Sequence, residues 1–260
     1  MDLGKGLGEL TYSTLVHPGD NWGEIWNSLT TYVPKVKERI APKKRFGVSL
    51  RLAAESAQTL VNNRAELEKL KKFLGDNDMY LYTVNAFPYG PFKGQIVKEK
   101  VYEPDWRSEE RTQYTINVAE VLADVCPEGS TPSIQTAPLG FKPRVTGPEV
   151  VESFTEHLLR VTAHLVGLHD RTGRAVGVSL EPEPYCFLET TDEVVDYFKN
   201  HLYTGASAAR LAKLAAIPIS EAHVALRRHV GTVFDICICL SSFFRRGGEI
   251  SVFRHGFPVL

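Results

Sequence analysis

The 260-residue sequence has only four cysteines and no excess of charge of either sign. Four cysteines are too few for a disulfide framework in a chain of this length, and Cys237 and Cys239 lack the spacing of a zinc site. We therefore expect a reduced, cytoplasmic protein whose cysteines act as small buried side chains. The formal net charge is −1 and the basic residues form no stripe, which argues against nucleic acid as a partner.

Long apolar runs and several signature motifs are also missing. No apolar stretch approaches the length of a membrane span, and the N-terminal ten residues, MDLGKGLGEL, lack the apolar core of a signal peptide. The sequence contains no Gly-x-Ser-x-Gly elbow, Walker loop or His-Glu-x-x-His pair, and no glycine-rich phosphate motif follows the first predicted strand. These absences argue against a membrane protein, a dinucleotide-binding sheet and the hydrolases that such motifs mark.

What the sequence does contain is an alternation of short β-branched runs with long amphipathic stretches, typical of a parallel sheet built from βα units. Six full strands and the start of a seventh are predicted, at residues 10–16, 46–52, 79–84, 133–137, 175–181, 231–237 and 257–260. Each full strand is followed by helical sequence. The pattern predicts an α/β fold, a (β/α) TIM-type barrel that stays incomplete, as a single domain over residues 1–260.

Helix boundaries are marked by residues with known capping preferences. Asp20 or Asn21, Ser108, and Thr190 with Glu193 are typical first residues, and Pro148 and Gly173 bound a long helix. Within this set, Thr190 and Glu193 predict a capping box. Pro34 is expected to interrupt the first helix, Gly75 to end a helix over residues 64–74, and residues 250–254 to end a last one.

The strand over residues 175–181 ends in two carboxylates separated by proline. Glu181 and Glu183 are two residues apart, so in an extended chain both side chains project from the same face. Like charges on one face repel unless a cation or a proton lies between them. We identify both as candidate catalytic residues, with solvated loop residues as the alternative interpretation.

Polar residues also follow the other predicted strands. His17, Asn85, Gln135 and Asp235 lie at or just after strand ends, where barrels assemble their active sites. Glu181 and Asp235 offer hard oxygen ligands for a divalent metal such as Mg²⁺ or Mn²⁺, with Zn²⁺ as a further candidate. His17, Asn85 and Gln135 would then bind substrate hydroxyls, although His17 and Asn85 are also suited to plain turns.

The connection over residues 86–107 is long for an α/β unit and rich in aromatic side chains. Phe87, Tyr89 and Trp106 are candidate substrate-binding residues within it. Loops of this length are commonly lids or binding loops. The alternative is a small aromatic core packed on the rim of the barrel.

Several motifs together resemble the metabolite-traffic protein EboE family, whose members are xylose-isomerase-like TIM barrels. The motifs begin at Val16 (VHPGD), Gly47 (GVSLRL), Asn85 (NAFPYG), Val97 (VKEKVY), Leu180 (LEPEP) and Phe234 (FDIC). The resemblance implies a sugar or polyol-like metabolite bound with a divalent metal, and an isomerase or epimerase acting by proton transfer. A non-catalytic metabolite carrier and, third, a metal-dependent phosphoester hydrolase are the alternatives.

The sequence departs from this family near its C-terminal end. The resemblance implies the motif Asp-x-Cys-His at the sixth strand. In this sequence Ile238 follows Cys237, so the expected histidine is missing. The family also implies a longer chain, so we expect the barrel to be truncated before its last strand. Open edges at the first and last strands would favour a homodimer.

Overall fold

A computed structural model of the chain describes residues 1–5, 7–91 and 98–236. Six strands form one sheet in which every hydrogen-bonded pair is parallel, and their order in space follows their order in the chain. The strands are β1 (Thr11–Ser13), β2 (Phe46–Arg51), β3 (Met79–Asn85), β4 (Ser133–Thr136), β5 (Gly177–Leu180) and β6 (Val230–Thr232). The prediction of an incomplete α/β barrel is confirmed.

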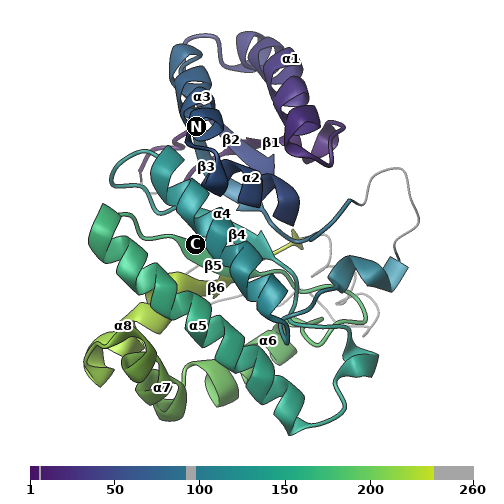
Figure 1. Cartoon of the computed structure of the whole chain (residues 1–260), viewed down its shortest axis with the longest axis vertical. Helices are drawn as coiled ribbons and strands as arrows, with labels where there is room; N and C mark the ends of the chain where they lie inside the picture. Colours follow the sequence, from purple (N-terminus) through teal and green to yellow (C-terminus); the bar gives the residue numbers. More distant parts are fainter. Residues whose placement is uncertain (6, 92–97, 237–260) are drawn as a thin grey trace.

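Helices connect these strands and pack on one another largely in chain order. They are α1 (Trp22–Ile40), α2 (Ala54–Asn62), α3 (Arg64–Asp76), α4 (Glu109–Val125), α5 (Pro148–Thr172), α6 (Thr191–Tyr197), α7 (Gly205–Ala215) and α8 (Ile219–His229). Shorter helical turns are η1 (Thr14–Val16), η2 (Lys98–Tyr102), η3 (Lys142–Arg144) and the π-helical η4 (Phe198–Leu202). In Figure 1, α2, α4 and α5 lie over the sheet, with α1 and α3 at one end of the row and α7 and α8 at the other.

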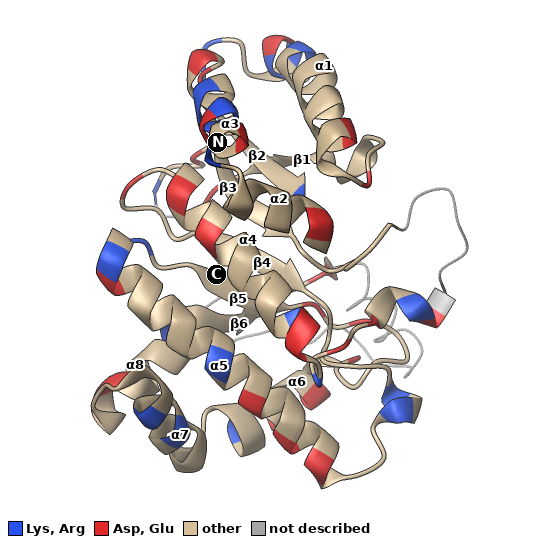
Figure 2. Ribbon diagram, in the orientation of Figure 1, with Lys and Arg blue, Asp and Glu red and all other residues tan. Residues whose placement is uncertain are grey.

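The core lies between the strands and the helices, as a sheet buried on both faces requires. All residues of β2 and β5 are buried, and the apolar faces of α4 and α5 pack against the sheet. Acidic and basic side chains are interspersed along the outer helices in Figure 2, while the strands are largely uncharged. Among the described helices, none is both long and apolar enough to cross a membrane.

The predicted helix starts are confirmed. Asn21 caps α1, Ser108 caps α4, and Thr190 forms a full capping box with Glu193 at the start of α6. Pro148 is the first residue of α5, and Gly173 ends that helix in the left-handed conformation at φ 69°. Local side-chain chemistry therefore fixes these ends, as the sequence indicates.

Four boundary predictions are wrong. The first strand, predicted over residues 10–16, covers only Thr11–Ser13, and Thr14–Val16 form the helical turn η1. The helix α1 continues through Pro34, because the burial of Leu29 and Val33 holds it across the missing backbone bond. The helix α3 includes Gly75 and ends at Asp76, where the following Asn77 donates its amide to the Phe73 carbonyl. β6 ends at Thr232, earlier than predicted, whereas the predicted strand at residues 257–260 and the helix ending at residue 254 lie outside the described residues.

Candidate functional site

A cavity of about 290 Å³ lies at the carboxyl ends of β3, β4 and β5. Parallel α/β sheets bind their ligands at this edge, because the loops there come from several strands. The residues that line the cavity are Leu15, Asn85, Phe87, Pro88, Val101, Tyr102, Gln135, Glu181 and Glu183.

Strand register brings the polar residues of the cavity together. Asn85, the last residue of β3, pairs in register with Gln135 of β4. The backbone N–H of Glu181, just past β5, donates to the Thr136 carbonyl at 3.0 Å, which continues the β4–β5 ladder by one residue. The Gln135 amide nitrogen then donates to the Glu181 carboxylate. The side chains of three neighbouring strand ends therefore face one space.

Glu181 and Glu183 form a pair of carboxylates with altered titration. Burial raises the pKa of Glu181, whose residue is 9% exposed; the bond from Gln135 opposes this rise, and the charge of Asp235 adds to it. Burial, and then the charges of Glu181 and Asp235, raise the pKa of Glu183 to about 7. The neighbouring charges that shift the pKa of the two groups are therefore negative, those of Asp235 and, for Glu183, of Glu181.

A backbone turn holds Glu183 beside the cavity. Its N–H donates to the Leu188 carbonyl at 3.0 Å, and its own carbonyl accepts from Cys186 at 3.1 Å. Pro182 and Pro184 flank it and restrict the chain on both sides. The position of the carboxylate is therefore set by the turn that follows β5.

One wall of the cavity is aromatic. The rings of Phe87 and Tyr102 pack edge to face with their centroids 5.7 Å apart. Tyr102 also stacks on Phe141, with the ring centroids 6.0 Å apart. Burial raises the pKa of Tyr102, as do its bond to Cys186 and the charges of both glutamates, so the phenol stays neutral. Tyr102 is a lining residue that we did not single out from the sequence; the only signal for it was its place in the long aromatic connection.

The other candidate residues lie outside the cavity lining. His17 bonds through its Nε2 to the Tyr12 hydroxyl at 3.0 Å and stacks on Tyr32 at 4.7 Å. Trp106 is fully buried in the core, and Tyr89 packs edge to face on Tyr114 at 5.3 Å. Asp235 is close enough for its charge to act on both glutamates, but it does not line the cavity.

The donor set can be tested against a divalent metal. Within residues 1–5, 7–91 and 98–236 there is no group of three His, Cys, Asp or Glu side chains that could hold an ion. Oxygen-ligand sites need about six donors, so Glu181 and Asp235 alone would leave most positions to water. The described residues therefore do not fit a tightly held resident ion.

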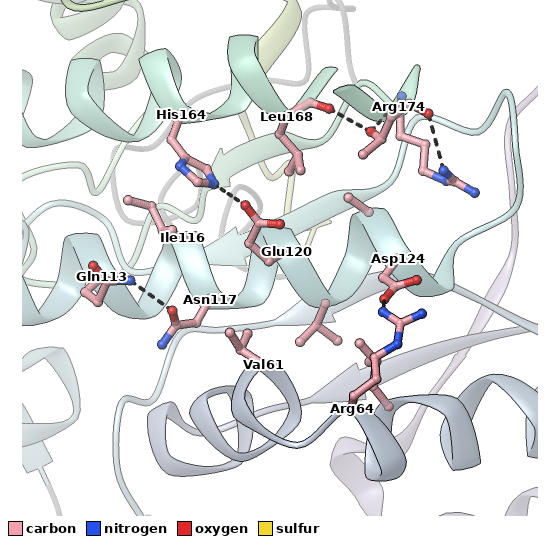
Figure 3. A pocket seen from close by; sticks show the side chains of 14 residues that line it. Val61, Arg64, Gln113, Ile116, Asn117, Glu120, Asp124, His164, Leu168 and Arg174 are labelled. Carbon is pink, nitrogen blue, oxygen red and sulfur yellow. Dashed lines mark hydrogen bonds and ion pairs between the residues drawn. The ribbon is translucent and has the colours of Figure 1, made fainter. Parts of the chain in front are cut away.

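A larger hollow, of about 580 Å³, lies in the outer helix layer, between α3, α4 and α5 (Figure 3). Its charged side chains already have partners: Arg174 donates to the carbonyls of Cys126 and Thr172, and the others form ion pairs. Asp124 binds Arg64 and Lys71, and Glu120 binds His164 at 2.8 Å. A surface whose charges are already satisfied offers less to a polar ligand than the cavity at the strand ends.

Comparisons with known proteins assign no family. No family model and no curated protein matches this chain, so the resemblance to the EboE family stays a prediction. Among solved structures, the chain is similar to a xylose isomerase domain protein from Planctomyces limnophilus, with 16% identity and a TM-score of 0.39 over 72% of this chain and 61% of that one. It is also similar to the probable 3-DHS dehydratase AsbF from Bacillus anthracis, with 12% identity and a TM-score of 0.39 over 85% and 71% of the two chains. A third is the 3-keto-D-glucoside 4-epimerase YcjR from E. coli, with 15% identity and a TM-score of 0.40 over 92% and 88%.

These values assign no activity to this chain. The chain spans less than two thirds of the first of these structures. Its function therefore has to be argued from its own cavity.

Proposed function

We propose that this chain binds an uncharged, sugar-like polyhydroxy metabolite in the cavity at the ends of β3, β4 and β5, and transfers a proton on it. The observation that carries the proposal is the convergence of two carboxylates and two amides on one cavity of about 290 Å³. Small-molecule sites combine a few convergent polar groups with apolar walls in this way.

The lining chemistry favours hydroxyl groups. Asn85 and Gln135 can donate and accept, and the two glutamates accept strongly, so together they can bind several hydroxyls. Phe87 and Tyr102 offer apolar faces to the C–H groups of a carbon ring or chain. The described lining contains no Lys or Arg, which disfavours a phosphate or carboxylate on the ligand.

The carboxylate pair supports proton transfer. Glu183 lies at the open turn after β5 and is the group we assign as base, whereas the Glu181 carboxylate is held by Gln135 and orients the ligand. Isomerases and epimerases of hydroxy-carbonyl compounds need a base of this kind beside the carbon that carries the proton. Deprotonated Glu183 would take the proton from the carbon next to the carbonyl, and the C–H electrons would pass to the carbonyl oxygen to give an enediolate. Glu183 would return the proton to the former carbonyl carbon, while the proton of the neighbouring hydroxyl passes to the other oxygen.

A resident divalent metal is not part of this proposal, because the described residues do not fit one. Glu181 and Asp235 alone would leave most coordination positions of such an ion to water. The proposed proton transfer uses Glu183 and does not depend on it.

A non-catalytic metabolite-binding or traffic protein is the second candidate. The observation that favours it is in the sequence, where Ile238 stands in place of the histidine that the family resemblance implies. Such a protein would use the same cavity and the same hydroxyl-binding groups. It would bind its ligand without exchanging a proton.

Deuterium incorporation from D₂O separates the two functions. The purified chain would be incubated with D-glucose, D-xylose or D-fructose, with D-glucose 6-phosphate as the anionic comparison, and followed by proton NMR. We expect loss of the C–H signal next to the carbonyl in at least one uncharged sugar, in samples with EDTA as well as in samples with Mn²⁺. Calorimetric binding without exchange would favour the carrier, and neither binding nor exchange would overturn the proposal.

A further inference from the structure

The loop that follows β3 is held through its backbone carbonyls. Four of the five carbonyls of residues 86–90 accept a hydrogen bond from a donor of their own, although the segment has no regular structure. The donors are Arg111 Nη1 to Ala86 and Phe87 at 3.0 Å each, the Ala54 N–H to Tyr89 at 2.9 Å and Arg51 Nη2 to Gly90 at 3.0 Å. The fifth carbonyl, of Pro88, lies 3.4 Å from the Tyr114 hydroxyl, whose shorter bond is to the Leu52 carbonyl. A loop held in this way is a fixed wall, in contrast to a lid.

Arg111 makes the central contacts and is fully buried. Its side chain extends from the first turn of α4, and its residue is 0% exposed. With the described residues it forms no ion pair; instead it binds backbone carbonyls and lies over the rings of Tyr89 and Tyr114, 5.9 and 5.5 Å from the ring centroids. Its Nη2 has no hydrogen-bond partner among the described residues. A buried cation of this kind is expensive, so its contribution to fold stability alone is a poor explanation for it.

The same guanidinium reaches a second segment of the cavity rim. Its Nε donates to the Pro104 carbonyl at 2.9 Å, two residues after Tyr102. Phe87 is therefore tied to Arg111 directly, and Tyr102 through Pro104. These two rings form the aromatic wall of the cavity and pack against each other, with their centroids 5.7 Å apart.

We infer that Arg111 is a positioning residue that joins the loop after β3 to the segment carrying Tyr102, and so sets the shape of the ligand cavity before any ligand binds. Its value for the ligand rests on the proposed function, whereas its effect on the two segments does not. A preformed wall reduces the ordering cost of binding, which is the benefit that the buried charge provides.

The test compares Arg111→Lys with the unmodified chain by amide hydrogen exchange without ligand. Lysine keeps the charge but offers its donors from one compact ammonium group, so it does not reproduce the spread of Nε and Nη1 by which Arg111 binds both segments. We expect exchange in residues 86–91 and 103–107 to be about tenfold faster, the factor for one lost hydrogen bond of about 1.4 kcal/mol. Exchange in β4 and β5 should be unchanged. Arg64→Met, on the exposed surface of α3, is the control and should leave both segments as they are.

Two further readouts keep positioning distinct from folding. D-fructose affinity, measured by calorimetry, should fall in Arg111→Lys while the thermal midpoint stays near that of Arg64→Met. Tyr114→Phe, which removes only the hydroxyl contacts with Leu52 and Pro88, should accelerate exchange around these two residues and leave residues 103–107 unchanged.

Unchanged exchange in both segments of a folded Arg111→Lys would overturn the inference, and so would unfolding of the whole chain. If no sugar binds the unmodified chain, the proposed function fails, but faster local exchange would still support the positioning role.

Discussion

Glu183→Gln is expected to lower the rate of deuterium incorporation into a bound sugar about a thousandfold, the middle of the range for removing a general base. Glutamine keeps the size of the side chain and cannot accept a proton at neutral pH. The backbone contacts of the turn, to Leu188 and Cys186, stay in place. Proton NMR in D₂O measures the rate directly.

The matched control is Glu152→Gln, since Glu152 is exposed on α5 and lies outside the cavity lining. Its rate should equal that of the unmodified chain. A Glu183→Gln variant that exchanges the proton at the normal rate would remove Glu183 from the reaction and leave Glu181 as the remaining acidic residue of the lining.

The second large effect concerns pH and a histidine far from the cavity. His229 ends α8, is 0% exposed and donates through Nδ1 to the Val176 carbonyl at 2.7 Å, while its Nε2 has no partner in the described part of the chain. Burial lowers its pKa from 6.5 to about 4, and the charges of Arg228 and His169 act in the same direction. The bond to Val176 and the charge of Asp170 oppose this.

The folded protein therefore keeps His229 neutral at pH values where the unfolded chain binds a proton. Its contribution to stability is fully present above pH 6.5 and is lost as the pH falls toward 4, with no further loss below that. At about 1.4 kcal/mol for each pH unit in this window, the loss amounts to about 3 kcal/mol in the free energy of unfolding.

Urea unfolding of His229→Asn between pH 7.5 and 4 tests this expectation. Asparagine can donate to the Val176 carbonyl but does not titrate, so the variant should lose about 3 kcal/mol less than the unmodified chain over this range. His223→Asn, on the same helix, should follow the unmodified chain. Parallel pH curves for the chain and its His229 variant would contradict the assignment.

The sequence predicts much of the fold because its signals are local. β2, β3, β4 and β5 form where short β-branched runs predict strands, and capping side chains begin the helices at Ser108 and Thr190. The errors at Pro34 and Gly75 have a common cause. There, tertiary packing and the cap at Asn77 outweigh a residue's own preference.

In the candidate site, too, the residues on or next to strands could be predicted and those in loops could not. Asn85, Gln135 and Glu181 meet at one cavity because each is fixed by its position on a parallel strand, and register follows from the sheet. The direction of loop side chains has no such rule. Trp106 turns into the core and Tyr102 toward the cavity, and only the contacts of this segment with α4 and with the loop after β4 decide between them.

For the long connection after β3, amino-acid composition does not distinguish a mobile lid from a packed rim. Its aromatic content is equally suited to a lid or to a packed rim. The structure shows that residues 86–90 are fixed by buried donors, which are contributed by Arg51, Ala54, Arg111 and Tyr114. These donors come from β2, α2 and α4, so the outcome depends on three elements that are distant in sequence from most of the loop.

The central claim is that the carboxylates at the end of β5 bind the ligand, and calorimetry on Glu181→Gln tests it most directly. Glutamine at this position can still accept from Gln135, so the variant loses mainly the charge. D-glucose, D-xylose and D-fructose would be titrated into the unmodified chain, Glu181→Gln and Glu152→Gln. The account predicts that at least one of the sugars binds to the unmodified chain and to Glu152→Gln. The affinity of Glu181→Gln should be about 100-fold lower, because hydrogen bonds to a charged group contribute about 1.5–3 kcal/mol. Equal affinities in all three proteins, or no binding of any of the sugars to the unmodified chain, would contradict it.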